Sequence, residues 1–80
     1  MSWFVYILRS DQDGDLYKEI TEDIQWRLEE HNSGKSKFTS SKTPWQLVYH
    51  KVMPNKREAI IEEKRLKKLN RTSLEKLFQG

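Results

Sequence analysis

The fold is decided by residues 3–21, which read WFVYILRSDQDGDLYKEIT. The first seven are rich in aromatic and β-branched side chains, as in a strand that is covered on both faces. Asp13-Gly14 is a strong signal for a two-residue hairpin loop, and residues 15–20 supply the return strand. We therefore expect the chain to begin with an antiparallel β-hairpin.

The hairpin is expected to gather polar side chains on one face. With a two-residue loop, Leu8 pairs with Glu19, and opposed residues share a face. Because side chains alternate along each strand, Tyr6 and Tyr17 project to the same side as that pair. A longer loop that shifted the register by one residue would break this arrangement.

A helix, a polar connection and a third strand are expected next. Thr21 is the expected N-cap of the helix, which runs to about Asn32 with Gly34 available to end it. Residues 33–44 form a long polar connection with three lysines and one phenylalanine, and connections of this length are often binding elements. Residues 45–52 are expected to form the third strand.

A second helix follows, and it carries two adjacent carboxylates. Asn55 and Glu58 match a capping box that opens this helix. Glu62 and Glu63 both fall within its apolar arc, so helical periodicity alone does not choose between them. The arc is defined by Ala59, Ile60, Leu66 and Leu69.

A short helix is expected to close the chain. Asn70 is an expected left-handed cap, and Thr72 with Glu75 matches another capping box. The helix is expected to bury Leu74, Leu77 and Phe78. The resulting order, ββαβαα, predicts a single α+β domain over residues 1–80, with a small three-stranded antiparallel sheet flanked by helices.

The composition excludes several classes of protein. Because the chain has 80 residues and no cysteine, a hydrophobic core must stabilise it without a disulfide framework or a thiolate zinc site. No apolar run approaches the roughly 20 residues of a membrane span, and no signal-peptide pattern opens the chain. We expect a cytoplasmic protein that makes no contact with membranes.

The charges are distributed unevenly along the chain. Residues 1–34 carry 3 basic and 8 acidic side chains, whereas residues 35–80 carry 12 basic and 4 acidic ones, for a net charge of +3. Such asymmetry suggests that the second half faces a polyanion, although a solvated lysine-rich helix would also produce it.

Several residue types together suggest phosphodiester chemistry. They are a carboxylate on an apolar helix face, the pair Arg27 and His31 one helical turn apart, and the tyrosines of the hairpin. Taken singly, each has a structural explanation: an ion pair, charges at the rim of the core, or half-buried phenols. Hydrolysis of a phosphodiester needs a cation on the phosphate oxygens, a metal that polarises them and a group that activates water. Arginine, a single carboxylate holding Mg²⁺, and tyrosine or histidine can meet these needs.

Nearly the whole chain resembles a known family. FVYIL at 4–8 and LYKEIT at 16–21 resemble the two halves of the GIY-YIG motif. The continuation is RLEEHNSGKSKFTSSKTPWQLVYH at 27–50 and REAIIEEKRLKKLNR at 57–71. In this order the segments are similar to small stand-alone GIY-YIG proteins related to the incision subunit of bacterial excision repair.

The resemblance implies a DNA endonuclease that uses one divalent cation, Mg²⁺ or Mn²⁺. It implies that Tyr6 activates water and that Tyr17 orients water or substrate. Arg27 would stabilise the phosphate, and His31 would assist proton transfer or hydrogen bonding. It also makes Glu63 the metal ligand, which resolves the ambiguity with Glu62.

One departure from the motif bears on activity. Glu19 stands where the motif has its last glycine, a residue that lets backbone or substrate approach closely. The carboxylate could fill that space and repel a phosphate, join Glu63 as a second metal ligand, or point outward.

Two other functions therefore remain open. One is a catalytically impaired GIY-YIG-like module that binds nucleic acid through lysines. The expected phosphate-binding lysines are Lys35, Lys37, Lys42, Lys64, Lys67 and Lys68. The other is a protein-interaction module with Trp26 as an exposed anchor. Because 80 residues leave little room for a separate recognition domain, a protein partner could supply specificity.

Overall fold

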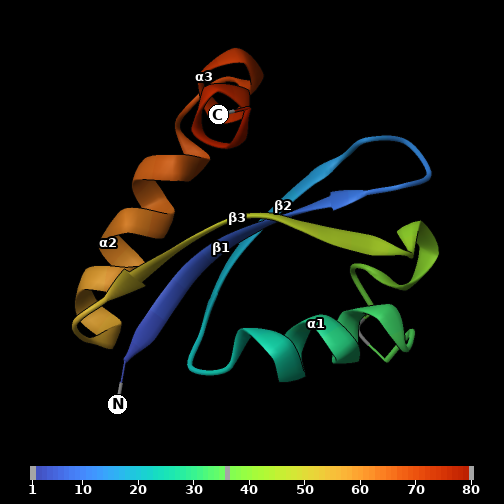
Figure 1. The fold of residues 1–80 in the computed structure, drawn as a ribbon, viewed down its shortest axis with the longest axis horizontal. Coiled ribbons are helices and arrows are strands. Elements are labelled where there is room, and N and C mark those ends of the chain that lie inside the picture. The colour runs from blue at the N-terminus through green and yellow to red at the C-terminus, as the bar shows by residue number, and fades with distance from the viewer. Residues whose placement is uncertain (1, 36, 80) are drawn as a thin grey trace.

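The computed structural model describes residues 2–35 and 37–79, and it has the predicted ββαβαα order. The three strands form one antiparallel sheet in the order β2-β1-β3. Helix α1 lies on one face of the sheet, and α2 and α3 lie on the other (Figure 1). The elements are β1 (Trp3–Ser10), β2 (Leu16–Thr21), α1 (Ile24–Asn32), a short 3-10 helix η1 (Ser40–Lys42), β3 (Trp45–Met53), α2 (Lys56–Lys67) and α3 (Arg71–Phe78).

The first hairpin has a longer loop than the sequence suggested. Tyr6 pairs with Glu19 and Leu8 pairs with Tyr17, so the predicted pairs were wrong by two residues. The Gly14 N–H donates to the Ser10 carbonyl at 2.9 Å, and Gly14 takes the left-handed conformation at φ 76° that this wider turn requires. Because the displacement is two residues and not one, every side chain keeps its predicted face.

Helix α1 begins two residues later than predicted. Asp23, and not Thr21, is the N-cap: its carboxylate accepts a hydrogen bond from the Trp26 N–H at 3.0 Å. The Thr21 hydroxyl oxygen instead accepts from the Asp23 N–H, which holds the cap residue in place. Gly34 follows the helix with φ 81°, as expected for a residue that ends a helix.

The caps of the last two helices confirm one prediction and correct two. Asn55 caps α2 as predicted, with its side-chain oxygen accepting from the Glu58 N–H at 2.9 Å. Asn70 is the N-cap of α3 and not a left-handed C-cap, since its φ is −76° and its side chain accepts from the Ser73 N–H. The predicted box that begins at Thr72 is therefore not the cap, because α3 has already begun at Arg71.

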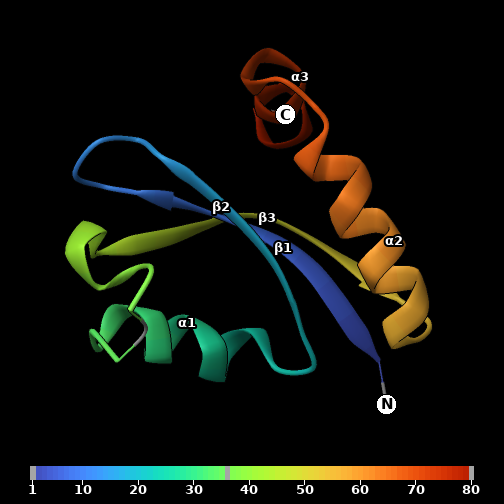
Figure 2. The same ribbon diagram turned by 180° about the vertical axis from the view of Figure 1, so that it is seen from behind.

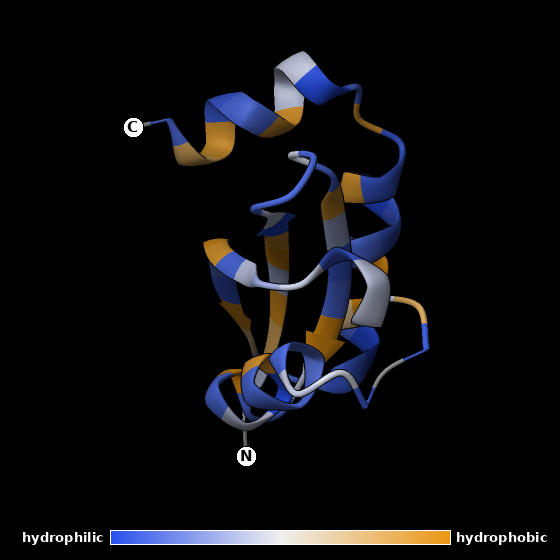
Figure 3. Ribbon diagram, turned by 90° about the vertical axis from the view of Figure 1, so that its right-hand side faces the viewer, coloured by the Kyte–Doolittle hydropathy of each residue, from blue (hydrophilic) through white to orange (hydrophobic). Residues whose placement is uncertain are grey.

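Strand β1 is central and separates two apolar clusters. Val5 and Ile7 pack with Leu66 and Leu74 beneath α2 and α3, and Leu77 and Phe78 join this cluster as predicted. Tyr6 and Leu8 point to the other face, where Trp45, Ile24 and Leu28 cover them. Figure 3 shows hydrophobic segments along the strands and on the side of α3 that faces the sheet. Tyr6 is therefore held inside the layer between the sheet and α1.

Within the described ranges, no helix is long and apolar enough to cross a membrane. Figure 2 shows the same layers from behind, with α1 on one face of the sheet and α2 and α3 on the other.

Candidate active site

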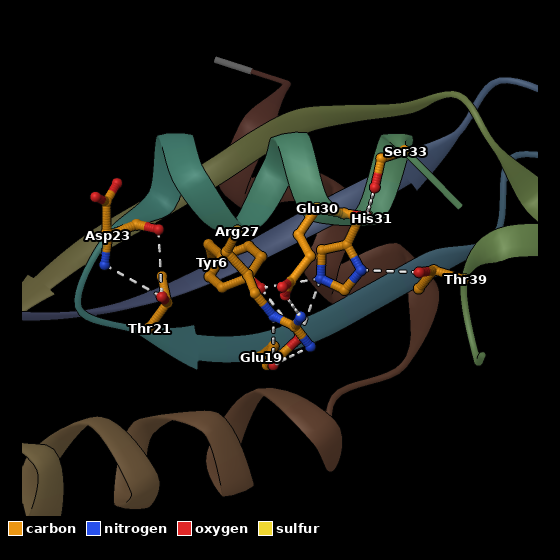
Figure 4. A network of polar contacts seen from close by, with 9 residues as sticks. All are labelled: Tyr6, Glu19, Thr21, Asp23, Arg27, Glu30, His31, Ser33 and Thr39. Atoms are coloured by element: carbon orange, nitrogen blue, oxygen red, sulfur yellow. Dashed lines mark hydrogen bonds and ion pairs between the residues drawn. The ribbon is translucent and has the colours of Figure 1, made fainter. Parts of the chain in front are cut away.

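Tyr6 presents its hydroxyl to a polar cluster under α1, which consists of Tyr6, Glu19, Arg27 and His31. The Tyr6 side chain is fully buried, and its hydroxyl donates to Glu19 Oε2 at 3.0 Å. The same hydroxyl oxygen lies 3.3 Å from His31 Nε2. Figure 4 shows these groups meeting between β1, β2 and α1. A phenol is thus placed beside an acid and an imidazole inside the protein.

Helix α1 contributes two members of this cluster. Arg27 and His31 are one turn apart, so both point toward the sheet. Arg27 Nε donates to Glu19 Oε1 at 3.1 Å, and the guanidinium also pairs with Glu30 one turn along the helix. His31 is fully buried and its Nε2 lies 3.2 Å from Glu19 Oε2.

Glu19 is at the centre of the cluster. Its carboxylate touches Tyr6, Arg27 and His31, and its side chain is 23% exposed. Of the orientations that the sequence left open, the structure therefore shows the carboxylate pointing inward and not outward. The carboxylate occupies the space in front of the Arg27 guanidinium.

Tyr17 lies at the edge of the same cluster. Its ring meets the His31 ring edge-on, with centroids 5.3 Å apart and an interplanar angle of 71°. It also lies against Trp45, with ring centroids 6.0 Å apart. Because β2 is an edge strand of the sheet, Tyr17 sits nearer the molecular surface than Tyr6 and remains half-buried.

Burial and neighbouring charges shift the pKa values of the two tyrosines and of His31. The pKa of Tyr6 is raised far above its usual range, first by burial and then by the negative charge of Glu19. The same two causes raise the pKa of Tyr17 to about 12. Burial, followed by the positive charge of Arg27, lowers the pKa of His31. At neutral pH the site therefore contains two protonated phenols and a neutral imidazole.

The two carboxylates of α2 have different surroundings. Glu62 is almost fully buried and accepts hydrogen bonds from Arg65 at 2.8 and 2.6 Å, a pairing that lowers its pKa. Glu63 has a side chain that is 17% exposed, and its ion pair is with Lys67, one turn along, at 3.3 Å. The charge of Glu63 also contributes to the raised pKa of Tyr17. Glu63 belongs to α2, on the face of the sheet opposite α1, and its charge is the smallest of these contributions to the pKa of Tyr17.

A metal would have to be held by few protein ligands. Among residues 2–35 and 37–79, no three His, Cys, Asp or Glu side chains are grouped so as to share an ion. Mg²⁺ usually keeps several waters and binds through one or two carboxylates together with substrate phosphate. Glu63 is a single, partly exposed carboxylate of that kind, and a metal there would displace its ion pair with Lys67.

Of the six lysines predicted to bind phosphate, two form ion pairs with carboxylates of the protein. Lys42 Nζ lies 3.1 Å from an Asp13 oxygen and 2.7 Å from an Asp15 oxygen, so two carboxylates offset its charge. Lys67 pairs with Glu63. The remaining four, all exposed, are Lys35, Lys37, Lys64 and Lys68.

Thr39 belongs to the site although the sequence analysis did not select it. It is fully buried, and its hydroxyl oxygen lies 2.8 Å from His31 Nδ1. A threonine within a stretch of serines and lysines carries no periodic signal, because burial there depends on how the connection folds back over α1.

The comparisons with known proteins identify the family of the chain. A family model described as the GIY-YIG catalytic domain matches residues 2–77. The chain is 45% identical over 65 residues to a UPF0213 protein of Bacillus pumilus (strain SAFR-032), covering 80% of this chain and 65% of that relative, which is less than two thirds of its length. It is 40% identical over 77 residues to a UPF0213 protein of Oceanobacillus iheyensis, covering 95% and 88% of the two chains.

A solved structure supports the fold. The solution NMR structure of a UPF0213 protein from Bacillus halodurans matches with a TM-score of 0.61 at 38% sequence identity, covering 96% of this chain and 82% of that chain. The resemblance seen in the two hairpin motifs thus extends through the family model, the relatives and the architecture. The chain belongs to the GIY-YIG family.

Proposed function

We propose that this protein is a metal-dependent endonuclease that hydrolyses DNA phosphodiesters, with its activity reduced by Glu19. The observation that supports this most strongly is the convergence of Tyr6, Arg27 and His31, from β1 and α1, on one point beside Tyr17. A phenol, a guanidinium and an imidazole at one point are the groups needed to activate water and to bind a phosphate.

Each residue has a role that its surroundings allow. Arg27 binds the nonbridging oxygens of the scissile phosphate with its planar fork of N–H donors. Tyr17, at the sheet edge, orients the attacking water or the substrate. Tyr6 takes a proton from that water as it passes its own proton to a neighbouring acceptor. In the parent that acceptor is Glu19 Oε2 at 3.0 Å, and without Glu19 it is His31 Nε2 at 3.3 Å.

Glu63 would hold the divalent cation, Mg²⁺ or Mn²⁺. When bound, such an ion would supply positive charge that polarises the phosphate and stabilises the transition state.

Glu19 opposes this reaction in two ways. Its carboxylate is already ion-paired with the Arg27 guanidinium, and its negative charge would repel a phosphate that approached Arg27. Two unit charges of the same sign about 4 Å apart repel by about 4 kcal/mol at an effective dielectric constant of about 20. A penalty of that size in the transition state slows a reaction by about three orders of magnitude.

The second candidate is a GIY-YIG-like module that binds nucleic acid without cutting it. The ion pair between Glu19 and Arg27 favours this reading, because a guanidinium that is already paired is poorly available to a phosphate. Binding would then depend on the exposed lysines of the connection and of α2, with the strong salt dependence of phosphate contacts. DNA is the proposed ligand in both cases, in the cytoplasm, and a protein partner would supply specificity.

Nicking of supercoiled plasmid with Mg²⁺ or Mn²⁺ separates the two candidates. The parent, Glu19→Gly, Glu19→Gln and Glu63→Ala are compared, with Glu29→Ala on the outer side of α1 as a matched control. We expect weak nicking by the parent, faster nicking by Glu19→Gly, and none by Glu63→Ala. Glu19→Gln keeps the side-chain volume and removes the charge, so its rate reports how much of the inhibition is electrostatic.

The endonuclease proposal fails if neither the parent nor Glu19→Gly cuts plasmid at any concentration of either metal. If only Glu19→Gly cuts, the parent is the binding module and Glu19 is the residue that prevents cleavage. Cutting that persists in Glu63→Ala would remove Glu63 from the proposed site.

A further inference from the structure

Thr39 joins the polar connection between α1 and β3 to the imidazole of the site. Its side chain is fully buried, although its neighbours in the sequence are mostly polar. Its carbonyl accepts a hydrogen bond from Trp45 Nε1 at 2.9 Å, which fixes the backbone there. Its hydroxyl lies 2.8 Å from His31 Nδ1. A buried hydroxyl costs free energy unless it is hydrogen-bonded, so the contact with His31 is what makes a threonine acceptable at this position.

The contacts of His31 determine which ring nitrogen carries the proton. An ionised carboxylate can only accept hydrogen bonds. Because Glu19 Oε2 lies 3.2 Å from His31 Nε2, Nε2 must be the protonated nitrogen and must donate to it. Nδ1 of the neutral ring then carries no proton and accepts from the Thr39 hydroxyl. In this arrangement His31 cannot take a proton from Tyr6, whose hydroxyl donates to Glu19 as well.

A different proton arrangement results when the carboxylate is absent. The Tyr6 hydroxyl then has His31 Nε2 as its acceptor, 3.3 Å away. Nε2 can accept only if the ring proton moves to Nδ1, which must then find an acceptor of its own. The Thr39 hydroxyl can rotate and accept from Nδ1–H, because a hydroxyl is both donor and acceptor. Serine keeps this ability and valine removes it.

We propose that Thr39 is a positioning residue of this site. Its hydroxyl orients the His31 ring, donating to Nδ1 when Nε2 is protonated and accepting from Nδ1–H when Nε2 is not. Glu19 selects the Nε2–H form, and removal of Glu19 selects the Nδ1–H form that can accept the Tyr6 proton. Only the catalytic consequence of this proposal rests on the proposed endonuclease function. The tautomer itself is a property of the folded chain and needs neither metal nor DNA.

Long-range ¹H–¹⁵N correlation spectra of the ¹⁵N-labelled protein at neutral pH test the proposal directly. They show which nitrogen of each histidine ring is protonated, and the exposed His50 provides an internal control. We expect His31 to be Nε2–H in the parent and Nδ1–H in Glu19→Gly. In the Glu19→Gly background, Thr39→Ser should keep a single Nδ1–H form, whereas Thr39→Val should give a mixture of tautomers.

The nicking assay gives an independent test in the Glu19→Gly background. Adding Thr39→Val should lower the nicking rate about tenfold or more, shift its pH profile and leave the apparent KM for plasmid unchanged, and Thr39→Ser should restore the rate. A His31 tautomer that is the same in Thr39→Val and Thr39→Ser would overturn the proposal, as would an Nδ1–H parent. If neither the parent nor Glu19→Gly cuts DNA, the endonuclease function fails while the spectra still decide the role of Thr39.

Discussion

Glu19 of β2 and Arg27 of α1 face each other across the polar cluster, with Arg27 Nη2 3.0 Å and Nε 3.1 Å from Glu19 Oε1. Strand β2 and helix α1 are thus joined by an ion pair at the place where a GIY-YIG domain carries a motif glycine in β2. The pair links fold stability to the proposed function, because the same carboxylate that joins β2 to α1 would obstruct the proposed phosphate position.

Replacing Glu19 should make the protein less stable even if it makes the site more open. Glu19→Ala leaves Arg27 with one carboxylate fewer and leaves the buried Tyr6 hydroxyl with His31 alone as a close partner. Loss of a buried hydrogen-bond partner costs about 1–3 kcal/mol. Urea unfolding followed by circular dichroism should show a lower midpoint for Glu19→Ala, with the slope unchanged. Glu22→Ala, on an exposed carboxylate, is the control, and equal stability of the two variants would contradict the structural role of Glu19.

Stability should fall as the pH drops below the ordinary histidine pKa of 6.5. Burial lowers the pKa of His31 in the folded protein, so the unfolded chain binds more protons in the range between the two values. The free energy of unfolding therefore decreases as pH falls through that range. His31→Gln should remove this dependence, whereas His50→Gln, at an exposed position, should leave it intact. A dependence that survives His31→Gln would mean that another group causes it.

The lysines should contribute unequally to DNA binding. Lys64→Ala and Lys68→Ala each remove an exposed cation of α2, and each should reduce the slope of log affinity against log salt by about 0.9 if that cation neutralises one phosphate. Lys42→Ala should change the slope least, because Asp13 and Asp15 already offset its charge. Fluorescence anisotropy with a labelled duplex at several salt concentrations measures the slope. Equal slopes for all three variants would contradict this distinction.

The sequence predicted the architecture because each element carries its own local signal. The run of aromatic and β-branched residues in β1, the Asn55 cap and the order of the elements were all confirmed. The hairpin pairs were wrong because Asp13-Gly14 is only part of a longer turn that begins at the Ser10 carbonyl. The prediction of which side chains share a face was still right, because side chains alternate with a period of two residues and the pairing was displaced by two residues.

The site was less predictable because it depends on contacts between distant segments. The motif positions selected Tyr6, Arg27 and His31, and their side chains lie together in the structure. Strand alternation predicted the face on which Glu19 lies, but no pattern in the sequence says whether its carboxylate turns inward or outward. The Glu19 carboxylate turns inward because Arg27, on the helix that covers this face of the sheet, donates a hydrogen bond to it. Thr39 was missed for the same reason, since its burial comes from the folded connection.

The central proposal is that Glu63 would hold a divalent cation next to the polar cluster, on the side of Tyr17. Paramagnetic broadening by Mn²⁺ tests it most directly, because the effect falls steeply with distance from the ion and needs no DNA. Titration of Mn²⁺ into the labelled protein should broaden the Tyr17 ring signals together with the Glu63 amide, and Glu63→Ala should abolish this broadening. Broadening that persists in Glu63→Ala, or that centres on the acidic loop at residues 11–15 instead, would contradict the account.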